Sequence, residues 1–250
     1  MMEQLAAILA GFRPVSLVEL DRAALQDRVE SKFLFPEVFL PGVLQALQQH
    51  YFILDIAGSR QFPYLTWYFD TPDFRLYRDH HNGYARRMKI RQRCYEQSGL
   101  AYFEVKRKYA EWRTGKSRIP IAALQAGLSP DMKALITGQR LDPAALEYKL
   151  SNRFRRITLC NYTFTERVTL DMDIGMERAG SSRRIGPVVL MELKQTRPDR
   201  QSPALQQMKQ RHIFESGFSK YAVAAAWLYP ELKHNNLKPV FLKLRQYTSV

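Results

Sequence analysis

Lysine and arginine side chains recur at every second position in several short segments of this chain. In Lys89-Ile90-Arg91-Gln92-Arg93 three cations alternate with uncharged residues. In Phe103-Glu104-Val105-Lys106-Arg107-Lys108 the charged positions 104, 106 and 108 alternate with apolar ones at 103 and 105. Because successive side chains of a β-strand point to opposite faces, each segment predicts a strand with one charged and one apolar face. Rows of lysine and arginine suit phosphate, since the guanidinium group binds phosphate oxygens through two parallel hydrogen bonds.

Two later segments repeat the alternation and add carboxylates. Arg167, Thr169 and Asp171 alternate with apolar residues, as do Glu192 and Lys194. For one strand alone, a solvated outer face is the commonest explanation. Four strands with more cations than carboxylates favour a bound anion, because like charges that face one another across a sheet destabilise it.

These strands could close into a barrel with the charged face inward. A wide barrel can keep a polar, wet interior that holds a ligand, so the result would be a cationic tunnel. Carboxylates in such a wall, Glu192 and Glu104, are candidate ligands for Mg²⁺ or Mn²⁺, which take carboxylate and phosphate oxygens. Asp171 and Asp173 are expected on the same face as Arg167. They could bind a second metal ion or form ion pairs, and pairing is favoured.

The composition agrees with a folded, basic protein. The chain has 250 residues, of which 38 are Lys or Arg and 24 are Asp or Glu, giving a formal net charge of +14. Such a charge indicates polyanionic partners. A hydrophobic content of 46% argues against disorder, and two cysteines exclude a disulfide framework. No apolar run could span a membrane and no secretory signal begins the chain, so we expect a cytoplasmic location.

The elements expected around these residues form an α+β fold with long antiparallel strands, because strands follow one another without regular helical crossovers. It is predicted as an antiparallel β-barrel tunnel with a polar cationic interior, flanked by helices. The expected strands span 29–35, 64–69, 87–95, 102–108, 153–160, 166–173 and 187–194. The expected helices span 36–50, 121–150, 203–215 and 220–229.

Taken in order, these segments resemble the VTC domain, the polyphosphate polymerase domain of the triphosphate tunnel metalloenzyme (CYTH-like) superfamily. The matching pieces are Ser31-Lys32-Phe33, Tyr68-Phe69-Asp70-Thr71, Lys89 to Arg93, Phe103 to Lys106, Trp112 with Gly115-Lys116-Ser117, Phe154 to Leu159, Glu166 to Asp171, Leu190 to Lys194, and Phe218-Ser219-Lys220-Tyr221. No single piece is specific for the VTC domain, whereas the ordered set of pieces is. The resemblance implies a tunnel domain over 28–229, and the sequence pattern predicts a helical lead-in over 1–27 and a basic tail over 230–250.

The resemblance also implies roles for individual residues. Catalysis is expected from Arg91, Arg93, Lys106 and Glu192, with Glu192 as the main metal carboxylate. The expected phosphate ligands are Lys32, Lys89, Lys116, Arg156, Arg167, Lys194 and Lys220. The chain departs from the family at Phe154, where a tyrosine is frequent, and at Ser216 and Gly217, where a basic residue is frequent.

The implied activity is metal-dependent transfer of the γ-phosphate of ATP onto a growing polyphosphate chain. Two alternatives stay open: a tunnel triphosphatase that hydrolyses triphosphates, and a non-catalytic module that binds polyphosphate or nucleotide. Nucleic acid is not expected, because no aromatic residue is interleaved with the cations for base stacking. The expected partners are ATP and polyphosphate, while a membrane-protein partner and the oligomeric state stay open.

The other motifs in the sequence give little information about function. Gly115-Lys116-Ser117 lacks the first glycine of a P-loop, since position 110 is Ala, and indicates a hairpin turn. His80 and His81 precede Asn82-Gly83 and are predicted to be exposed in a loop. Of Arg153, Arg155 and Arg156, only some are expected to face inward.

Overall fold

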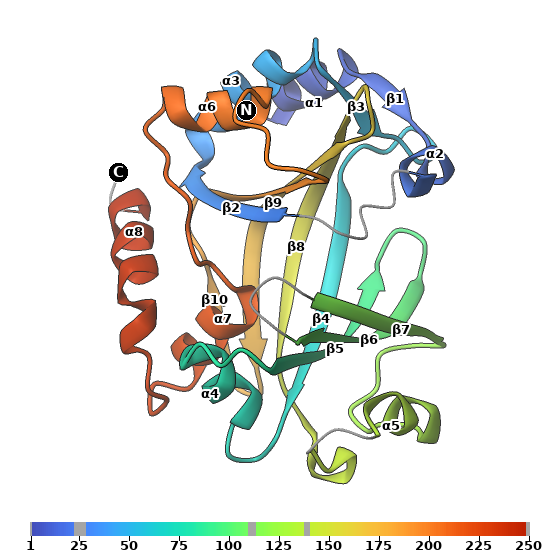
Figure 1. Ribbon diagram of the computed structural model, residues 1–250, viewed down its shortest axis with the longest axis vertical. Coiled ribbons are helices and arrows are strands. Elements are labelled where there is room, and N and C mark those ends of the chain that lie inside the picture. The colour runs from blue at the N-terminus through green and yellow to red at the C-terminus, as the bar shows by residue number, and fades with distance from the viewer. Residues whose placement is uncertain (1, 23–28, 110–113, 138–140, 249–250) are drawn as a thin grey trace.

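A curved antiparallel sheet organises the protein (Figure 1). The computed structural model describes residues 2–22, 29–109, 114–137 and 141–248. Within them, eight strands follow in the spatial order β2-β11-β9-β8-β4-β5-β6-β7. Their bounds are β2 Val29–Pro36, β4 Phe62–Asp70, β5 Arg87–Tyr95, β6 Leu100–Lys108, β7 Thr114–Ile121, β8 Glu147–Asn161, β9 Glu166–Arg178 and β11 Val188–Gln195. Three short strands extend the sheet: β1 (Arg13–Val15), β3 (Tyr51–Leu54) and β10 (Ser181–Arg184).

The outer face of the sheet is apolar and covered by helices. Phe33, Leu170 and Met191 belong to one buried cluster with α1 (Met2–Ala10), α3 (Leu40–Leu47) and α6 (Pro203–Gln210). A second outer cluster joins β5 and β6 to α5 (Pro130–Ile136). Alternation along each strand therefore turns residues such as Lys32, Glu192 and Asp171 to the inner face, as the sequence pattern predicts.

One end of the inner face is filled by α7 (Lys220–Leu228). Its buried small residues, Ala222 and Ala224 to Ala226, pack in one cluster with Leu34 of β2, Phe154 of β8 and Leu190 of β11. Small side chains allow the helix to approach the sheet closely. The rest of the inner face is lined by charged side chains.

An ion pair between distant strands shows how strongly the sheet curves. Lys106 of β6 lies 3.3 Å from Glu30 of β2, measured from Nζ to Oε2. These two strands stand at nearly opposite ends of the strand order. The predicted closure is incomplete, because within the described residues β2 is not hydrogen-bonded to β7. The outer edge of β2 instead pairs with Glu215 and Ser216. The antiparallel tunnel architecture is confirmed in this open, curled form.

Several local predictions were wrong. The helix expected over 121–150 is only the short α5, a 3₁₀ turn at Pro143–Ala145 and the beginning of β8. Lys116 lies within strand β7 rather than in a turn. His80 and His81 lie on α4 (Arg75–His81), and His81 is buried, with Nε2 2.9 Å from Oδ1 of Asn235. Trp112 lies outside the described residues.

The ends of the chain are more structured than predicted. Besides α1, the lead-in contains α2 (Leu17–Arg22) and strand β1, which pairs in parallel with β3. The tail forms α8 (Lys238–Thr248), which buries Val240 and Leu244 against the cluster around α7. Among the described residues, no helix is long and apolar enough to cross a membrane.

Candidate phosphate-binding tunnel

The predicted site residues come together on the inner face of the curled sheet. Strand register brings Lys32 opposite Glu192, Lys194 opposite Arg167, and Lys89 opposite Lys106. Arg156 faces Asp171 across β8 and β9, and Lys106 faces Lys116 across β6 and β7. Lys220, at the start of α7, reaches the same face from the helix that fills one end.

Glu104 is held by two cations in the wall of the tunnel. Arg91 contacts its Oε2 at 2.7 Å, and Lys116 contacts its Oε1. The carboxylate is buried, which alone would raise its pKa, but Arg91, Arg93 and Lys116 outweigh burial and lower the pKa well below the usual range. Glu104 is therefore ionised, and both of its oxygens are taken by cations.

Lys89 is a buried ammonium group surrounded by other cations. Its Nζ donates a hydrogen bond to Oγ of Ser219 at 2.9 Å. Burial lowers the pKa of Lys89 well below its ordinary value, and the charges of Lys32 and Lys106 lower it further. A bound anion would favour the protonated form of Lys89, because an opposite charge nearby stabilises an ammonium group. The environment of Lys89 therefore favours anion binding.

Asp171 gathers two cations beside an aromatic surface. Arg156 binds it from two nitrogens, at 2.6 and 2.8 Å, and Lys220 contacts the same carboxylate. Burial raises the pKa of Asp171, but the two cations outweigh burial and bring the pKa to about 2. The cationic groups of Arg156 and Lys220 both lie over the ring of Phe154, and Lys220 Nζ is 4.4 Å from the ring centroid. The ring thus positions cations by cation–π attraction where the family often has a tyrosine hydroxyl.

The side chain of Glu192 is 20% exposed, against 1–2% for Glu104 and Asp171, so Glu192 is more accessible to a ligand than these two carboxylates. Lys194 contacts its Oε1 at 2.5 Å. Burial raises the pKa of Glu192, but Lys194, Lys32 and Arg156 lower it well below the usual value. Across the strand pair, the buried Oγ1 of Thr169 has no hydrogen-bond partner within the described residues. A carboxylate beside an unpaired hydroxyl fits a hard cation that completes its coordination with water and phosphate oxygens.

The described residues contain no cluster of three or more His, Cys, Asp or Glu side chains able to hold a metal ion alone. Mg²⁺ is commonly bound by one or two carboxylates together with substrate phosphates. Glu192 fits that mode. The metal role predicted for Glu104 stays a prediction, and its two ion pairs leave it less room.

Two predicted arrangements differ in the structure. Asp173 was expected to share a face with Asp171, but a bulge at Asp173, which has a φ of +52°, changes the alternation of β9. Asp173 pairs with Arg155, whereas Asp171 faces the tunnel. Arg153 pairs with Glu96 at the surface, so Arg156 is the member of the arginine cluster that faces inward.

Sequence reasoning missed two inner-face residues, Arg118 and Ser219. Arg118 lies opposite Glu104 across β6 and β7, with its guanidinium 4.8 Å from the ring centre of Tyr102. It stands two positions after Lys116, so a strand assignment over 114–121 would have found it. Ser219 caps α7 through a hydrogen bond from the Ala222 amide and also accepts from Lys89.

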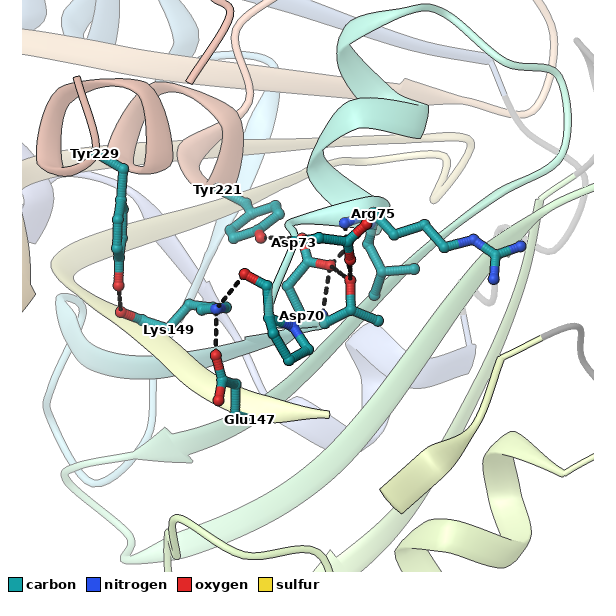
Figure 2. A network of polar contacts seen from close by, with 10 residues as sticks. Asp70, Asp73, Arg75, Glu147, Lys149, Tyr221 and Tyr229 are labelled. Atoms are coloured by element: carbon teal, nitrogen blue, oxygen red, sulfur yellow. Dashed lines mark hydrogen bonds and ion pairs between the residues drawn. The ribbon is translucent and has the colours of Figure 1, made fainter. Parts of the chain in front are cut away.

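A buried polar network supports α7 from below (Figure 2). Asp70, at the end of β4, accepts a hydrogen bond from the hydroxyl of Tyr221 and from the amides of Leu76 and Tyr77, both at 2.8 Å. This carboxylate joins β4 to α4 and α7. It thereby fixes the helix that presents Lys220 and Ser219 to the tunnel.

Comparison with family profiles identifies the family of the chain. A profile of the VTC domain family matches residues 27–229, so the chain belongs to the VTC domain family. A comparison with curated proteins found no match. Among solved structures, the chain is similar to a candidate adenylyl cyclase from Hippeastrum described as having a dominant triphosphatase activity, with 16% identity, a TM-score of 0.49, and coverage of 83% of this chain and 100% of that one. It is also similar to a candidate adenylate cyclase from Vibrio parahaemolyticus, with 15% identity, a TM-score of 0.47, and coverage of 80% and 99%.

Proposed function

We propose that this protein is a metal-dependent polyphosphate polymerase that transfers the γ-phosphate of ATP onto a polyphosphate chain inside the tunnel. The observation that carries the proposal is the partly buried set of cations around Lys89, Arg91 and Arg156 on the inner face, where cations outnumber carboxylates. Membership of the VTC domain family supports the same activity.

The proposed reaction needs little covalent chemistry from the protein. An oxygen of the terminal phosphate of the chain forms a bond to the γ-phosphorus of ATP, the bond from that phosphorus to the β,γ-bridging oxygen breaks, and ADP leaves. Such a transfer depends on in-line positioning and on cations that stabilise the charge of the phosphoryl oxygens. We assign this stabilisation to Arg91, Arg93 and Lys106, and ground-state phosphate binding to Lys32, Lys89, Lys116, Arg156, Arg167, Lys194 and Lys220.

Glu192, with the hydroxyl of Thr169 beside it, would hold the metal ion. Mg²⁺ or Mn²⁺ bound there would supply neutralisation of phosphate charge. Glu104 has a different proposed role, because it is already paired. It orients Arg91 and Lys116 toward the phosphates.

The proposal is tested with purified protein, ATP and either Mg²⁺ or Mn²⁺, with products separated by gel electrophoresis. We expect ADP together with a ladder of polyphosphate. ADP and free phosphate without polymer would identify a triphosphatase, in which water replaces the chain as the nucleophile. ATP binding without turnover, with both metals and with added short polyphosphate, would identify a binding module and overturn both enzymatic assignments.

A further inference from the structure

A second basic cavity lies beside the tunnel, where α4 meets the beginning of β5 and the end of β6. Its volume is about 540 Å³. The cationic side chains that line it are Arg75, Arg86, Arg87, Arg107 and Lys108. The family resemblance and the proposed catalytic reaction use none of these five residues.

Arg107 is a buried cation in the lining of this cavity. Only 9% of the residue is exposed. One guanidinium nitrogen donates to Oγ of Ser117 at 3.3 Å and another to the carbonyl of Leu135, while Nε has no partner within the described residues. None of these contacts is a carboxylate. A buried cation without a negative partner is costly, so the site favours an anion.

Arg87 and Lys108 add a pair of like charges. They face one another directly across β5 and β6. Such a pair destabilises a sheet unless an anion lies between the charges. Burial lowers the pKa of Arg87, so its environment also disfavours the isolated charge. The neighbouring pair, Lys89 and Lys106, belongs to the tunnel. Arg107 and Met88 lie on the opposite face of the sheet from Arg87 and Lys108. Residues of both faces therefore line the cavity at the ends of β5 and β6.

The cavity also has an apolar side that an inorganic phosphate chain would not need. Leu76, Met88, Leu141 and Tyr109 line it together with the cations. Tyr109 is half-exposed, so its ring is available to stack with a flat group. Asp79 is the carboxylate in the lining, and a carboxylate can accept hydrogen bonds from sugar hydroxyls.

We propose that this cavity binds a nucleoside phosphate, with its phosphates on Arg87, Arg107 and Lys108 and its base against Tyr109. In this proposal the cations bind the phosphates, the aromatic and aliphatic side chains contact the base, and Asp79 accepts hydrogen bonds from the ribose hydroxyls. The cavity adjoins the tunnel but uses none of the residues proposed for it, and the proposal does not rest on the polymerase activity.

The test measures ADP and inorganic triphosphate binding by calorimetry, in the wild-type protein and in an Arg91→Ala background that weakens the tunnel. We expect Arg87→Glu combined with Lys108→Glu to weaken ADP binding at least about tenfold in both backgrounds, because two phosphate-facing charges are reversed. Tyr109→Ala should weaken ADP binding severalfold and leave inorganic triphosphate unchanged, since it removes only the stacking surface.

Arg183→Glu combined with Arg184→Glu is the matched control, because both are exposed arginines on β10 and their double reversal changes the net charge by the same amount. It should leave ADP affinity unchanged. Three results would overturn the proposal: no effect of the cavity reversals on ADP, an effect that disappears in the Arg91→Ala background, or equal weakening of both ligands by Tyr109→Ala. Circular dichroism melting would establish that each variant is folded.

Discussion

Arg156 and Asp171 face one another across β8 and β9 and form a two-contact ion pair, with Nε–Oδ1 at 2.6 Å and Nη2–Oδ2 at 2.8 Å. Lys220 contacts the same carboxylate from α7. Without a ligand, one buried carboxylate thus partly neutralises two of the predicted phosphate ligands. It keeps their side chains in place for an anion.

Replacing Asp171 by Asn should therefore destabilise the empty protein more than the protein with bound anion. The substitution leaves Arg156 and Lys220 without their contacting carboxylate, so that the charge of Glu192 is left to act on both, and losing one side of a buried ion pair costs about 3–5 kcal/mol. We expect a lower Tm for Asp171→Asn and a larger increase in Tm on adding inorganic triphosphate than in wild type. Differential scanning fluorimetry measures both.

Asp173→Asn is the comparison variant, because Asp173 pairs with Arg155 and both side chains are more than a third exposed. Its Tm should change little, since exposed ion pairs contribute about 0–1 kcal/mol. Equal triphosphate-induced shifts in the two variants would show that Arg156 and Lys220 are not phosphate ligands.

Phosphate affinity should fall as the pH rises above about 8. Burial lowers the pKa of Lys220 and of Lys116 to about 8, although Asp171 and Glu104 oppose the shift. A bound anion favours the protonated ammonium and raises both pKa values, so binding above pH 8 should take up protons. Calorimetry of triphosphate binding in buffers of different ionisation enthalpy measures this uptake.

The same groups affect folding with the opposite sign. Between about pH 8 and the ordinary lysine pKa near 10.4, the unfolded chain binds more protons than the folded one, so these lysines make the free protein more stable as pH rises. Lys116→Arg combined with Lys220→Arg should reduce the proton uptake, because arginine stays protonated. The remaining uptake is expected from Lys89, whose pKa burial also lowers. Uptake equal to that of the wild type would contradict the assignment.

The strands that carry the site could be predicted because their charges alternate directly in the sequence. Lys89 to Arg93 and Glu192 with Lys194 needed only the two-residue period. The strand around Lys116 could not be found in this way, since Gly115 and Pro120 are typical of turns and mask it. Arg118 was missed for the same reason.

Long-range features had no local signal. The contact between Lys106 and Glu30 depends on the curvature of the whole sheet. The separation of Asp171 from Asp173 depends on one residue with positive φ, which the alternation of β9 does not reveal. The partner of Asp70 could not be inferred either, because Tyr221 lies 151 residues further along the chain.

Removing the Asp70 carboxylate should loosen the end of the tunnel that α7 fills (Figure 2). Asp70→Ala leaves the Tyr221 hydroxyl and the amides of Leu76 and Tyr77 without their acceptor, and each unsatisfied buried group costs about 1–3 kcal/mol. We expect a large loss of stability in urea unfolding. Asp73→Ala, which removes an exposed ion pair with Arg78 and one acceptor for the Thr71 hydroxyl, should have a smaller effect. Similar losses in both variants would show that the Asp70 network does not hold α4 and α7 together.

Arg91→Ala and Glu192→Gln should abolish turnover for different reasons. Arg91 is proposed to bind the transferring phosphoryl group, so its loss should reduce both ATP binding and turnover. Glutamine at 192 keeps the shape of glutamate but removes the charge that a divalent cation needs, so Glu192→Gln should leave metal-free triphosphate binding intact while abolishing metal-dependent turnover. The measurements are steady-state ADP release and calorimetry with and without Mn²⁺. Arg183→Glu, which changes an exposed residue of β10 with no proposed role, should retain full turnover. If Glu192→Gln turned over ATP at the wild-type rate, the metal site would have to lie elsewhere; if Arg91→Ala did so, the phosphoryl group would not pass through the wall formed by β5 and β6.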